Sequence, residues 1–229
     1  MIEPVEMSGL LRLKVWGEAA CFTRPEMKVE RVSYDVMTPS AARGVLESIF
    51  WKPAIRWQVE QIDVLKPIRW ASVRRNEVGC VMSSRSRHIF VEEQRQQRAG
   101  LLLRDVAYTI HARLELTEKA STEDSAIKYK EMFLRRVKKG QCFHRPYLGC
   151  REFAAHFEPV LSVRQLPTPI RESRELGSML LDMDYSQPSP IPRFFCAHLI
   201  KGQVKVPNPR LNRGSHDSSG AHELLQSIM

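Results

Sequence analysis

The sequence lacks paired cysteine motifs and long apolar runs. Its five cysteines are an odd number and include no C-x-x-C pair, which argues against both a zinc ribbon and a disulfide framework. No stretch approaches the roughly 18 apolar residues that a membrane-spanning helix needs, and no charged-then-apolar leader opens the chain. We therefore expect a cytoplasmic protein with reduced thiols, no metal or other cofactor, and no membrane partner.

Acidic residues are too few to balance the basic ones. Lysine and arginine total 35 against 26 aspartate and glutamate, so the formal charge is +9 and the pI is about 9.5. Such an excess favours a polyanionic partner, because lysine and arginine release counterions from phosphates. The 229 residues are 43% hydrophobic, which is ordinary for a globular protein of one large or two small domains. Nucleic acid is the favoured class of partner.

The clearest candidate for binding nucleic acid is an amphipathic helix that begins at Ser121. Ser121 with Asp124 makes a variant of the capping box, and Gly140 is a natural stop. Apolar residues recur on one side, whereas the cations fall largely on other faces: Ala126, Tyr129, Phe133 and Val137 against Lys128, Arg135, Arg136, Lys138 and Lys139. A basic helix alone is also typical of a solvated surface.

The neighbourhood of this helix favours chemistry on RNA. Lys128 and Tyr129 are adjacent near its start, and the turn behind it, CFHRPYLGC, carries His144, Arg145 and Tyr147. Cleavage of RNA without a metal needs a group that takes the proton from the ribose 2′-OH and another that protonates the departing 5′-oxygen. It also needs a cation that stabilises the extra charge on phosphorus. The residue types in this stretch match those needs.

The remaining elements predict an α+β fold. Strands are expected over residues 10–22, 55–75, 101–116 and 151–161, and a second helix begins at Thr38 and Pro39 with Ala42, Val45, Leu46 and Ile49 buried. Together with the basic helix, the order is β-α-β-β-α-β, which is that of a ferredoxin-like (RRM-type) domain. Because the aromatic signature of sheet-face RNA readers is missing, the helix and loop side is the expected RNA surface.

We place the ferredoxin-like domain at residues 1–165 and a small antiparallel β domain with a flexible tail at residues 166–229. In the second domain, residues 178–185 and 194–206 read as strands, with a hairpin turn at Lys201-Gly202. Residues 76–100 are rich in Arg, Gln and Ser and are predicted to form a basic insertion loop. The candidates for contact with the RNA backbone are Arg85, Arg87, Arg135, Arg136, Lys138, Lys139 and Arg145.

Several blocks of the sequence resemble a known family. KVWGEAACFTRPEMKVERVSYDVMTPSAARGVLESIFWKP, then LKPI, then the helix ending in KKG and the LGCREF after it, are similar to the CRISPR-associated Cas-five proteins of subtype I-C, the d or Dvulg branch. The resemblance runs from Leu11 to about Val206. It implies a ferredoxin-like domain followed by a small β domain.

The resemblance also implies an endoribonuclease that cuts the repeat hairpin of precursor CRISPR RNA without metal. Such a protein then stays on the 5′ tag of the guide with the other subunits of a type I-C interference complex. The family's catalytic tyrosine, lysine and histidine fall on Phe50, Lys128 and Tyr129. Phe50 has no hydroxyl and could only stack on a base. We expect Lys128 to stabilise the developing charge, with Tyr129 or His144 as proton shuttle, and a 2′,3′-cyclic phosphate as product.

Two other interpretations remain open. The departures at Phe50 and Tyr129 are compatible with a guide-RNA-binding scaffold of the same family that has lost cleavage. The positive charge alone is compatible with a basic protein that binds duplex DNA. A cleavage assay on the repeat hairpin separates the first reading from the second, and a preference for any duplex favours the third.

Overall fold

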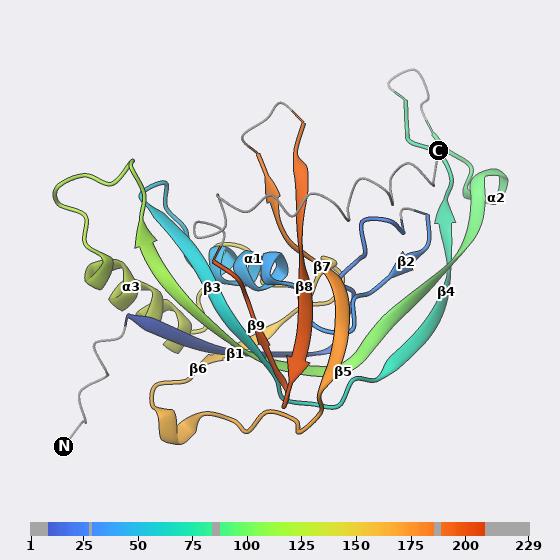
Figure 1. Ribbon diagram of the computed structural model, residues 1–229. Coiled ribbons are helices and arrows are strands. Elements are labelled where there is room, and N and C mark those ends of the chain that lie inside the picture. The colour runs from blue at the N-terminus through green and yellow to red at the C-terminus, as the bar shows by residue number, and fades with distance from the viewer. Residues whose placement is uncertain (1–8, 28, 84–87, 186–188, 209–229) are drawn as a thin grey trace.

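One curved sheet holds the nine strands found in residues 9–27, 29–83, 88–185 and 189–208, which are the residues described by the computed structural model. The sheet curls around α1 and α3, which lie on its concave side (Figure 1). In chain order the elements are β1 (Leu10–Ala20), β2 (Arg31–Val32), α1 (Pro39–Ile49), β3 (Ile55–Val64), β4 (Trp70–Val78), α2 (Val91–Gln94), β5 (Arg95–Leu116), α3 (Ala126–Lys138), β6 (His156–Pro159), the 3-10 helix η1 (Val163–Gln165), β7 (Arg174–Asp184), β8 (Ile191–Ile200) and β9 (Gln203–Lys205).

The first two thirds of the chain contain the predicted β-α-β-β-α-β order, with β2, β4 and α2 added to it. The elements that match this order are β1, α1, β3, β5, α3 and β6, and their strands lie in the sheet order β6-β1-β5-β3 with every neighbouring pair antiparallel. The single strand expected over residues 55–75 is wrong, because β3 ends at Val64 and β4 begins at Trp70. The long strand β5 is central, because it pairs with β1 on one side and β3 on the other. This mostly antiparallel sheet with helices on one face is a mixed α and β fold, as the sequence predicted.

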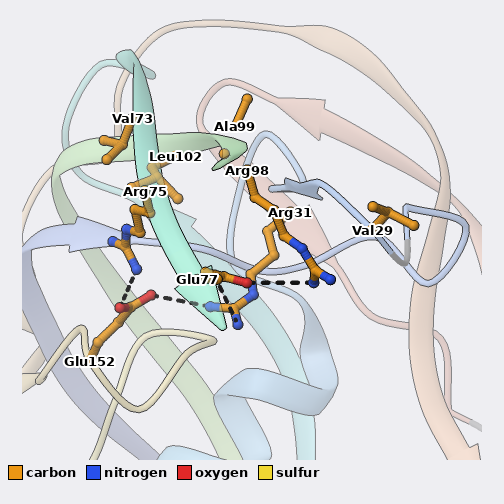
Figure 2. Close-up of a pocket in the computed structure, with 10 residues that line it drawn as sticks. Val29, Arg31, Val73, Arg75, Glu77, Arg98, Ala99, Leu102 and Glu152 are labelled. Atoms are coloured by element: carbon orange, nitrogen blue, oxygen red, sulfur yellow. Dashed lines mark hydrogen bonds and ion pairs between the residues drawn. The ribbon is translucent and has the colours of Figure 1, made fainter. Parts of the chain in front are cut away.

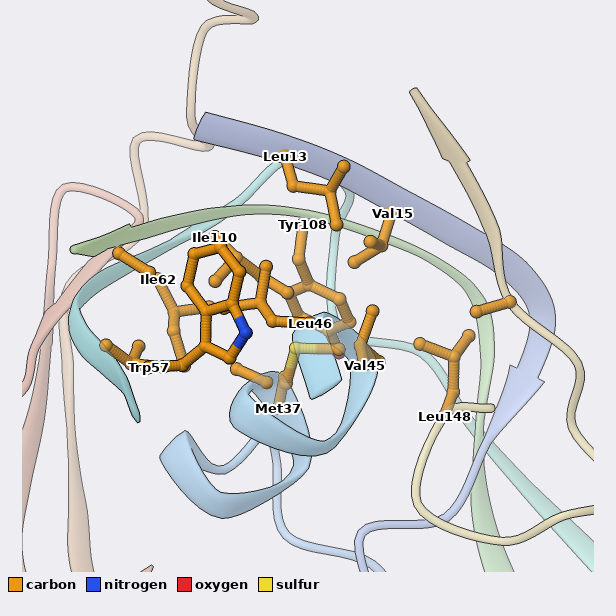
Figure 3. Close-up of a cluster of buried hydrophobic side chains, with 14 of the residues drawn as sticks. Leu13, Val15, Met37, Val45, Leu46, Trp57, Ile62, Tyr108, Ile110 and Leu148 are labelled. Carbon is orange, nitrogen blue, oxygen red and sulfur yellow. The ribbon is translucent and has the colours of Figure 1, made fainter. Parts of the chain in front are cut away.

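The core lies between α1 and the sheet (Figure 3). Alternation along β1 puts Leu13 and Val15 on the covered face, and both are fully buried against Val45 and Leu46 of α1. Trp57 of β3 fills the space beside them, and its indole Nε1 donates a 2.9 Å hydrogen bond to the carbonyl oxygen of Phe50. Burying each such side chain contributes about 2 kcal/mol. The α1 helix is therefore held firmly against the sheet.

Helix α1 confirms its sequence prediction in detail. The Thr38 side chain accepts a hydrogen bond from the backbone nitrogen of Ala41 at 3.2 Å, and Pro39 occupies the first turn. The predicted stripe of Ala42, Val45, Leu46 and Ile49 is buried. The helix ends at Ile49, and the extended backbone of the next residue, Phe50, begins the turn into β3.

The predicted insertion loop over residues 76–100 is corrected at its two ends, where residues 76–78 and 95–100 belong to strands. Strands β4 and β5 form one long hairpin, with pairing from Trp70 opposite Leu103 to Val78 opposite Arg95. Arginine and glutamine side chains predominate here because most positions along both strands are at least partly exposed, so long polar side chains fit a two-sided ribbon. Arg85 and Arg87 lie outside the described residues.

An ion-pair cluster joins the β4–β5 hairpin to the rest of the protein (Figure 2). The cluster encloses a cavity of only about 20 Å³, room for roughly one water molecule. Glu152 pairs with Arg75, and with Arg31 at 3.5 Å; Glu77 pairs with Arg31 at 3.7 Å and with Arg98 at 3.4 Å. These arginines are therefore matched by carboxylates and hold the hairpin in place.

Two predicted boundaries are corrected by the structure. Helix α3 begins at Ala126 instead of Ser121, because the Asp124 carboxylate accepts from the backbone nitrogen of Ser121 at 2.8 Å and closes a separate turn. The strand expected over residues 151–161 is only the four residues of β6. The predicted stop at Gly140 is confirmed, because the helix runs to Lys138 and Gly140 has a φ of +64°.

The last three strands continue the same sheet. Strands β8 and β9 form the predicted hairpin, with Ile200 opposite Gln203 across Lys201-Gly202, and β9 pairs with β3. Side chains from this region, including Met179 of β7 and Leu199 of β8, belong to the common core. The division of the chain at residue 166 stays a prediction. Most of the predicted tail, residues 209–229, lies outside the described residues.

Candidate nucleic-acid interface

The exposed side of α3 presents the predicted row of cations. The side chains of Lys128, Arg135, Lys138 and Lys139 are exposed, whereas Tyr129, Phe133 and Val137 are buried on the opposite side. Arg136 differs from this group, because it is half-buried and its Nε donates a 2.9 Å hydrogen bond to the carbonyl oxygen of Ile49. Arg136 therefore joins α3 to the C-terminal end of α1 with part of its guanidinium group.

Tyr129 lies in the core, which contradicts its predicted role as proton shuttle. Its side chain packs on Phe50, and its exposed fraction is 3%. Its hydroxyl donates a hydrogen bond to Asp124. That hydrogen bond raises the pKa of Tyr129, because the neighbouring carboxylate disfavours a phenolate, and burial acts in the same direction. The phenol is thus a still poorer base than an ordinary tyrosine.

Phe50 is also buried, so the prediction that it stacks on a base is wrong. Only 5% of the residue is exposed, and its ring centroid lies 6.0 Å from that of Tyr129. The next residue along the chain, Trp51, is 56% exposed. Sequence reasoning passed over Trp51, because a single aromatic at the end of a helix gives no periodic signal that separates the buried neighbour from the exposed one.

The turn after α3 places His144 at the C-terminal end of α1. The backbone nitrogens of Phe143 and His144 both donate to the carbonyl oxygen of Ser48, at 2.8 Å and 3.1 Å. The ring of Phe143 is 78% exposed and contacts the His144 imidazole edge-on, with centroids 4.4 Å apart. His144 and Arg145 are both exposed. An imidazole, a cation and an aromatic ring are therefore available to solvent on one anchored turn.

Lys52 is a further cation in this region that the sequence reasoning did not select. Its Nζ lies 5.4 Å from the centre of the Tyr129 ring, and its side chain is exposed. Lys128 is the residue immediately before Tyr129 in α3. The signal was the SIFWKP block, where Lys52 follows the aromatic pair. Only the fold brings its charge to α3.

A pocket of about 270 Å³ opens beside the first half of α1. Its walls include the hydroxyl residues Thr23, Thr38 and Ser40, together with Gly44, Tyr147 and Leu180. Tyr147 belongs to the same turn as His144, so this turn runs along α1 from Ser48 back to Gly44. The pocket and the exposed cations of the turn therefore border one continuous stretch of chain.

One wall of the pocket adjoins two cysteines bridged by a hydroxyl. The Thr23 Oγ1 lies 3.6 Å from the sulfur of Cys21 and 3.7 Å from that of Cys150. Interaction with the Cys21 thiol, aided by Thr23 and the charge of Arg31, lowers the pKa of Cys150 to about 6. The same pairing, together with burial, raises the pKa of Cys21. The Cys150 sulfur also lies 3.5 Å from the carbonyl oxygen of Cys21, so the two cysteines and Thr23 form one hydrogen-bonded group.

Neither a metal-ligand cluster nor a membrane-crossing helix occurs in the described part of the chain. No three or more His, Cys, Asp or Glu side chains there are grouped as ligands for an ion. None of the described helices is long and apolar enough to cross a bilayer.

Comparison with solved structures identifies the class of protein that shares this fold. A structure described as that of a CRISPR-associated protein superposes with a TM-score of 0.66 over 87% of this chain and 92% of that chain, at 21% identity. The fold is thus one found among CRISPR-associated proteins. The chain belongs to the Cas_Cas5d family, CRISPR-associated protein (Cas_Cas5), which matches residues 10–207. This confirms the resemblance seen in the sequence.

Two relatives support the same assignment. A protein of Mannheimia succiniciproducens is 49% identical over 217 residues, which is 88% of this chain and 96% of that protein. A protein of Thermus thermophilus is 46% identical over 215 residues, covering 86% of this chain and 91% of its own length. Both are named CRISPR pre-crRNA endoribonuclease Cas5d.

Proposed function

We propose that this chain is an endoribonuclease that cuts precursor CRISPR RNA within its repeat hairpin, without a metal ion. It then stays on the 5′ tag of the guide with the other subunits of a type I-C interference complex. The observation that carries the proposal is the 49% and 46% identity, over most of the chain, to two proteins named as pre-crRNA endoribonucleases. The exposed cations of α3 supply a surface that suits the substrate.

The cleavage step is an attack by the ribose 2′-oxygen on the neighbouring phosphorus. As the new P–O bond forms, the bond to the 5′-oxygen breaks, and the products are a 2′,3′-cyclic phosphate and a free 5′-hydroxyl. The 2′-OH loses a proton to a base, and the departing 5′-oxygen gains one. Negative charge builds up on the phosphoryl oxygens in the transition state, where a nearby cation stabilises it.

We assign the charge-stabilising role to Lys128 and the proton shuttle to His144. Both side chains are exposed, whereas Tyr129 is buried with its hydroxyl bonded to Asp124. A neutral imidazole can accept and then return a proton near neutral pH. Trp51 and Phe143, which are 56% and 78% exposed, replace Phe50 as the candidates for stacking on unpaired bases.

The decisive experiment incubates the protein with the repeat hairpin of its own CRISPR array in the presence of EDTA. We expect one cut near the 3′ base of the stem, with a product that carries a 2′,3′-cyclic phosphate. A strict requirement for Mg²⁺ would overturn metal independence, and His144→Ala with undiminished cleavage would overturn the role of His144. The matched control is His156→Ala, since His156 is also exposed but lies on β6.

A second candidate function is a guide-RNA-binding scaffold without cleavage. It is favoured by the absence of a hydroxyl at Phe50 and by the burial of Tyr129. Tight binding of the hairpin without any cut would select this function. A third candidate, a basic protein that binds duplex DNA, rests on the charge of +9, and binding to any duplex with no preference for the hairpin would select it.

A further inference from the structure

We propose that the pocket beside α1 receives a single unpaired nucleobase of the RNA, with the base lying against Tyr147 and above Gly44. This inference rests on the proposed function, because it assumes that RNA is the ligand. It adds a base-holding site distinct from the groups assigned to cleavage. The evidence is the size of the pocket, its chemistry, its unusual glycine and its position on the chain.

The size of the pocket suits one planar ring system. Its volume of about 270 Å³ is just below the roughly 300 Å³ at which pockets for drug-sized ligands begin. An extended peptide or several stacked bases would not fit in that space. The cavity inside the ion-pair cluster, at about 20 Å³, is far too small for any such group.

The lining combines the groups that hold a nucleobase. Tyr147 supplies an aromatic face and is 39% exposed, and aromatic faces stack on every base. The residues Thr23, Thr38 and Ser40 supply hydroxyl groups, which can both donate and accept hydrogen bonds and so can meet the edge of a base. Leu180 adds an apolar side.

Gly44 is a residue that packing inside the chain does not explain. It occupies the middle of the 11-residue helix α1, where glycine destabilises a helix relative to alanine. A Cβ built at this position would meet no atom within 4 Å. No neighbouring atom in the described structure therefore requires this residue to be glycine. Glycine at such a place is typical of close approach between backbone and a ligand. Gly44 is on the pocket lining, so that ligand would sit in the pocket.

The position of the pocket agrees with the path of an RNA strand. Tyr147 lies two residues after the exposed Arg145 and three after His144, on the turn anchored to Ser48. Ser48 and Gly44 are one turn of helix apart, which is about 6 Å along the axis. A strand held by the cations of the turn thus has a neighbouring nucleotide within reach of the pocket.

The test compares Gly44→Leu, which fills the pocket, with Gly44→Ala as the matched small variant. A Cβ at this position meets no atom within 4 Å, so Gly44→Ala should keep the wild-type melting temperature or exceed it by about 2 °C. We expect Gly44→Leu, whose longer side chain points into open space at its Cβ, to melt within about 2 °C of wild type as well. The probe is repeat RNA with a 2′-deoxynucleotide at the mapped cut position. Gly44→Leu should weaken its binding at least about fivefold, because stacking of one base contributes roughly 5- to 160-fold. Tyr147→Ala should weaken it similarly, whereas Tyr147→Phe should not.

An abasic scan separates failure of this inference from failure of the proposed function. One abasic position in the probe should weaken binding to the wild-type protein and cause no further loss with Gly44→Leu or with Tyr147→Ala. If the wild-type protein cuts and binds the hairpin, but both variants bind like wild type or lose affinity equally at every abasic position, only the base pocket is overturned. If the wild-type protein does not bind the hairpin, the proposed function fails and this inference falls with it.

Discussion

The hydroxyl of Tyr129 donates a hydrogen bond to the carboxylate of Asp124, in the turn that precedes α3. The bond lowers the pKa of Asp124, whose carboxylate also accepts from the backbone of Ser121, and it raises the pKa of Tyr129. The phenol is thereby a structural group that fixes the start of α3. The side chain of Tyr129 is buried, whereas the side chain of its neighbour Lys128 is exposed to solvent.

The first prediction concerns Tyr129 itself. Tyr129→Phe removes only the hydroxyl and keeps the ring in the core, so we expect cleavage of the repeat hairpin to stay within about threefold of wild type. The unfolding free energy should fall by about 1 kcal/mol, the typical contribution of a hydrogen bond. Single-turnover cleavage and urea denaturation measure the two effects. A hundredfold loss of rate in a fully folded Tyr129→Phe protein would restore the phenol to the reaction.

The second prediction concerns Lys128. Lys128→Ala removes the cation proposed to stabilise the developing charge, so the single-turnover rate should drop at least about 100-fold. Binding of the hairpin should weaken far less. The control is Lys138→Ala in the last turn of the same helix, which should weaken binding and reduce its salt dependence without a specific loss of rate. Equal effects of the two replacements on rate would move the reaction centre away from Lys128.

The third prediction is a dependence of stability on pH that originates at Asp124. Because the pKa of Asp124 is lowered in the folded protein, its stabilising effect is complete above the unfolded pKa of about 4 and is lost as the pH falls through the folded pKa. The difference in unfolding free energy between wild type and Asp124→Asn should therefore be constant from pH 5 to pH 7 and shrink below about pH 4. Urea denaturation across this range tests it. A difference that grows toward acid pH would contradict the assigned direction.

The fourth prediction concerns the reactivity of Cys150. Because Cys21 and Thr23 lower its pKa to about 6, we expect the Cys150 sulfur to be largely a thiolate at neutral pH, and the thiolate is the form that reacts. Alkylation of the Cys150 peptide by iodoacetamide, followed by mass spectrometry, should rise with a midpoint near pH 6. The same peptide in urea-unfolded protein should show the ordinary midpoint of about 8.5. Identical midpoints in the two states would show that Cys21 does not activate Cys150.

The fifth prediction compares two glycines that share a positive φ but differ in their surroundings. Gly149 has a φ of +85°, and a Cβ there would lie 1.9 Å from the carbonyl oxygen of Cys21; Gly140 has a φ of +64° with no atom within 4 Å. Gly140→Ala should cost about 1 kcal/mol of unfolding free energy from backbone strain alone. Gly149→Ala must also displace backbone, so the loss should exceed about 4 kcal/mol. Similar losses at both sites would mean that the turn moves freely away from Cys21.

Predictions from the sequence succeeded where the contacts that decide a structure lie close together along the chain. Helix α1 was predicted closely, because its cap at Thr38, its proline and its buried stripe all lie within the residues 38–49. The start of α3 was misplaced, because Ser121 and Asp124 close a turn before the helix instead of capping it. Both arrangements use the same side chain and nearly the same spacing, so the sequence alone does not separate them.

The hairpin of β4 and β5 shows a different limit. Its polar composition is that of a loop, but pairing over residues 70–78 and 95–103 makes a ribbon, and the carboxylates of Glu77 and Glu152 hold its arginines. Backbone pairing between distant segments does not depend on side-chain hydrophobicity, so composition does not reveal it.

The β-α-β-β-α-β core order, the basic side of α3 and the family all followed from the sequence, because periodicity, caps and shared motifs are local properties of the chain. The tertiary structure alone decided that Trp51 faces solvent instead of its neighbour Phe50. It also brought Tyr147 to Gly44 and His144 to Ser48. Burial and proximity depend on how distant segments pack against one another, and no local pattern encodes that packing.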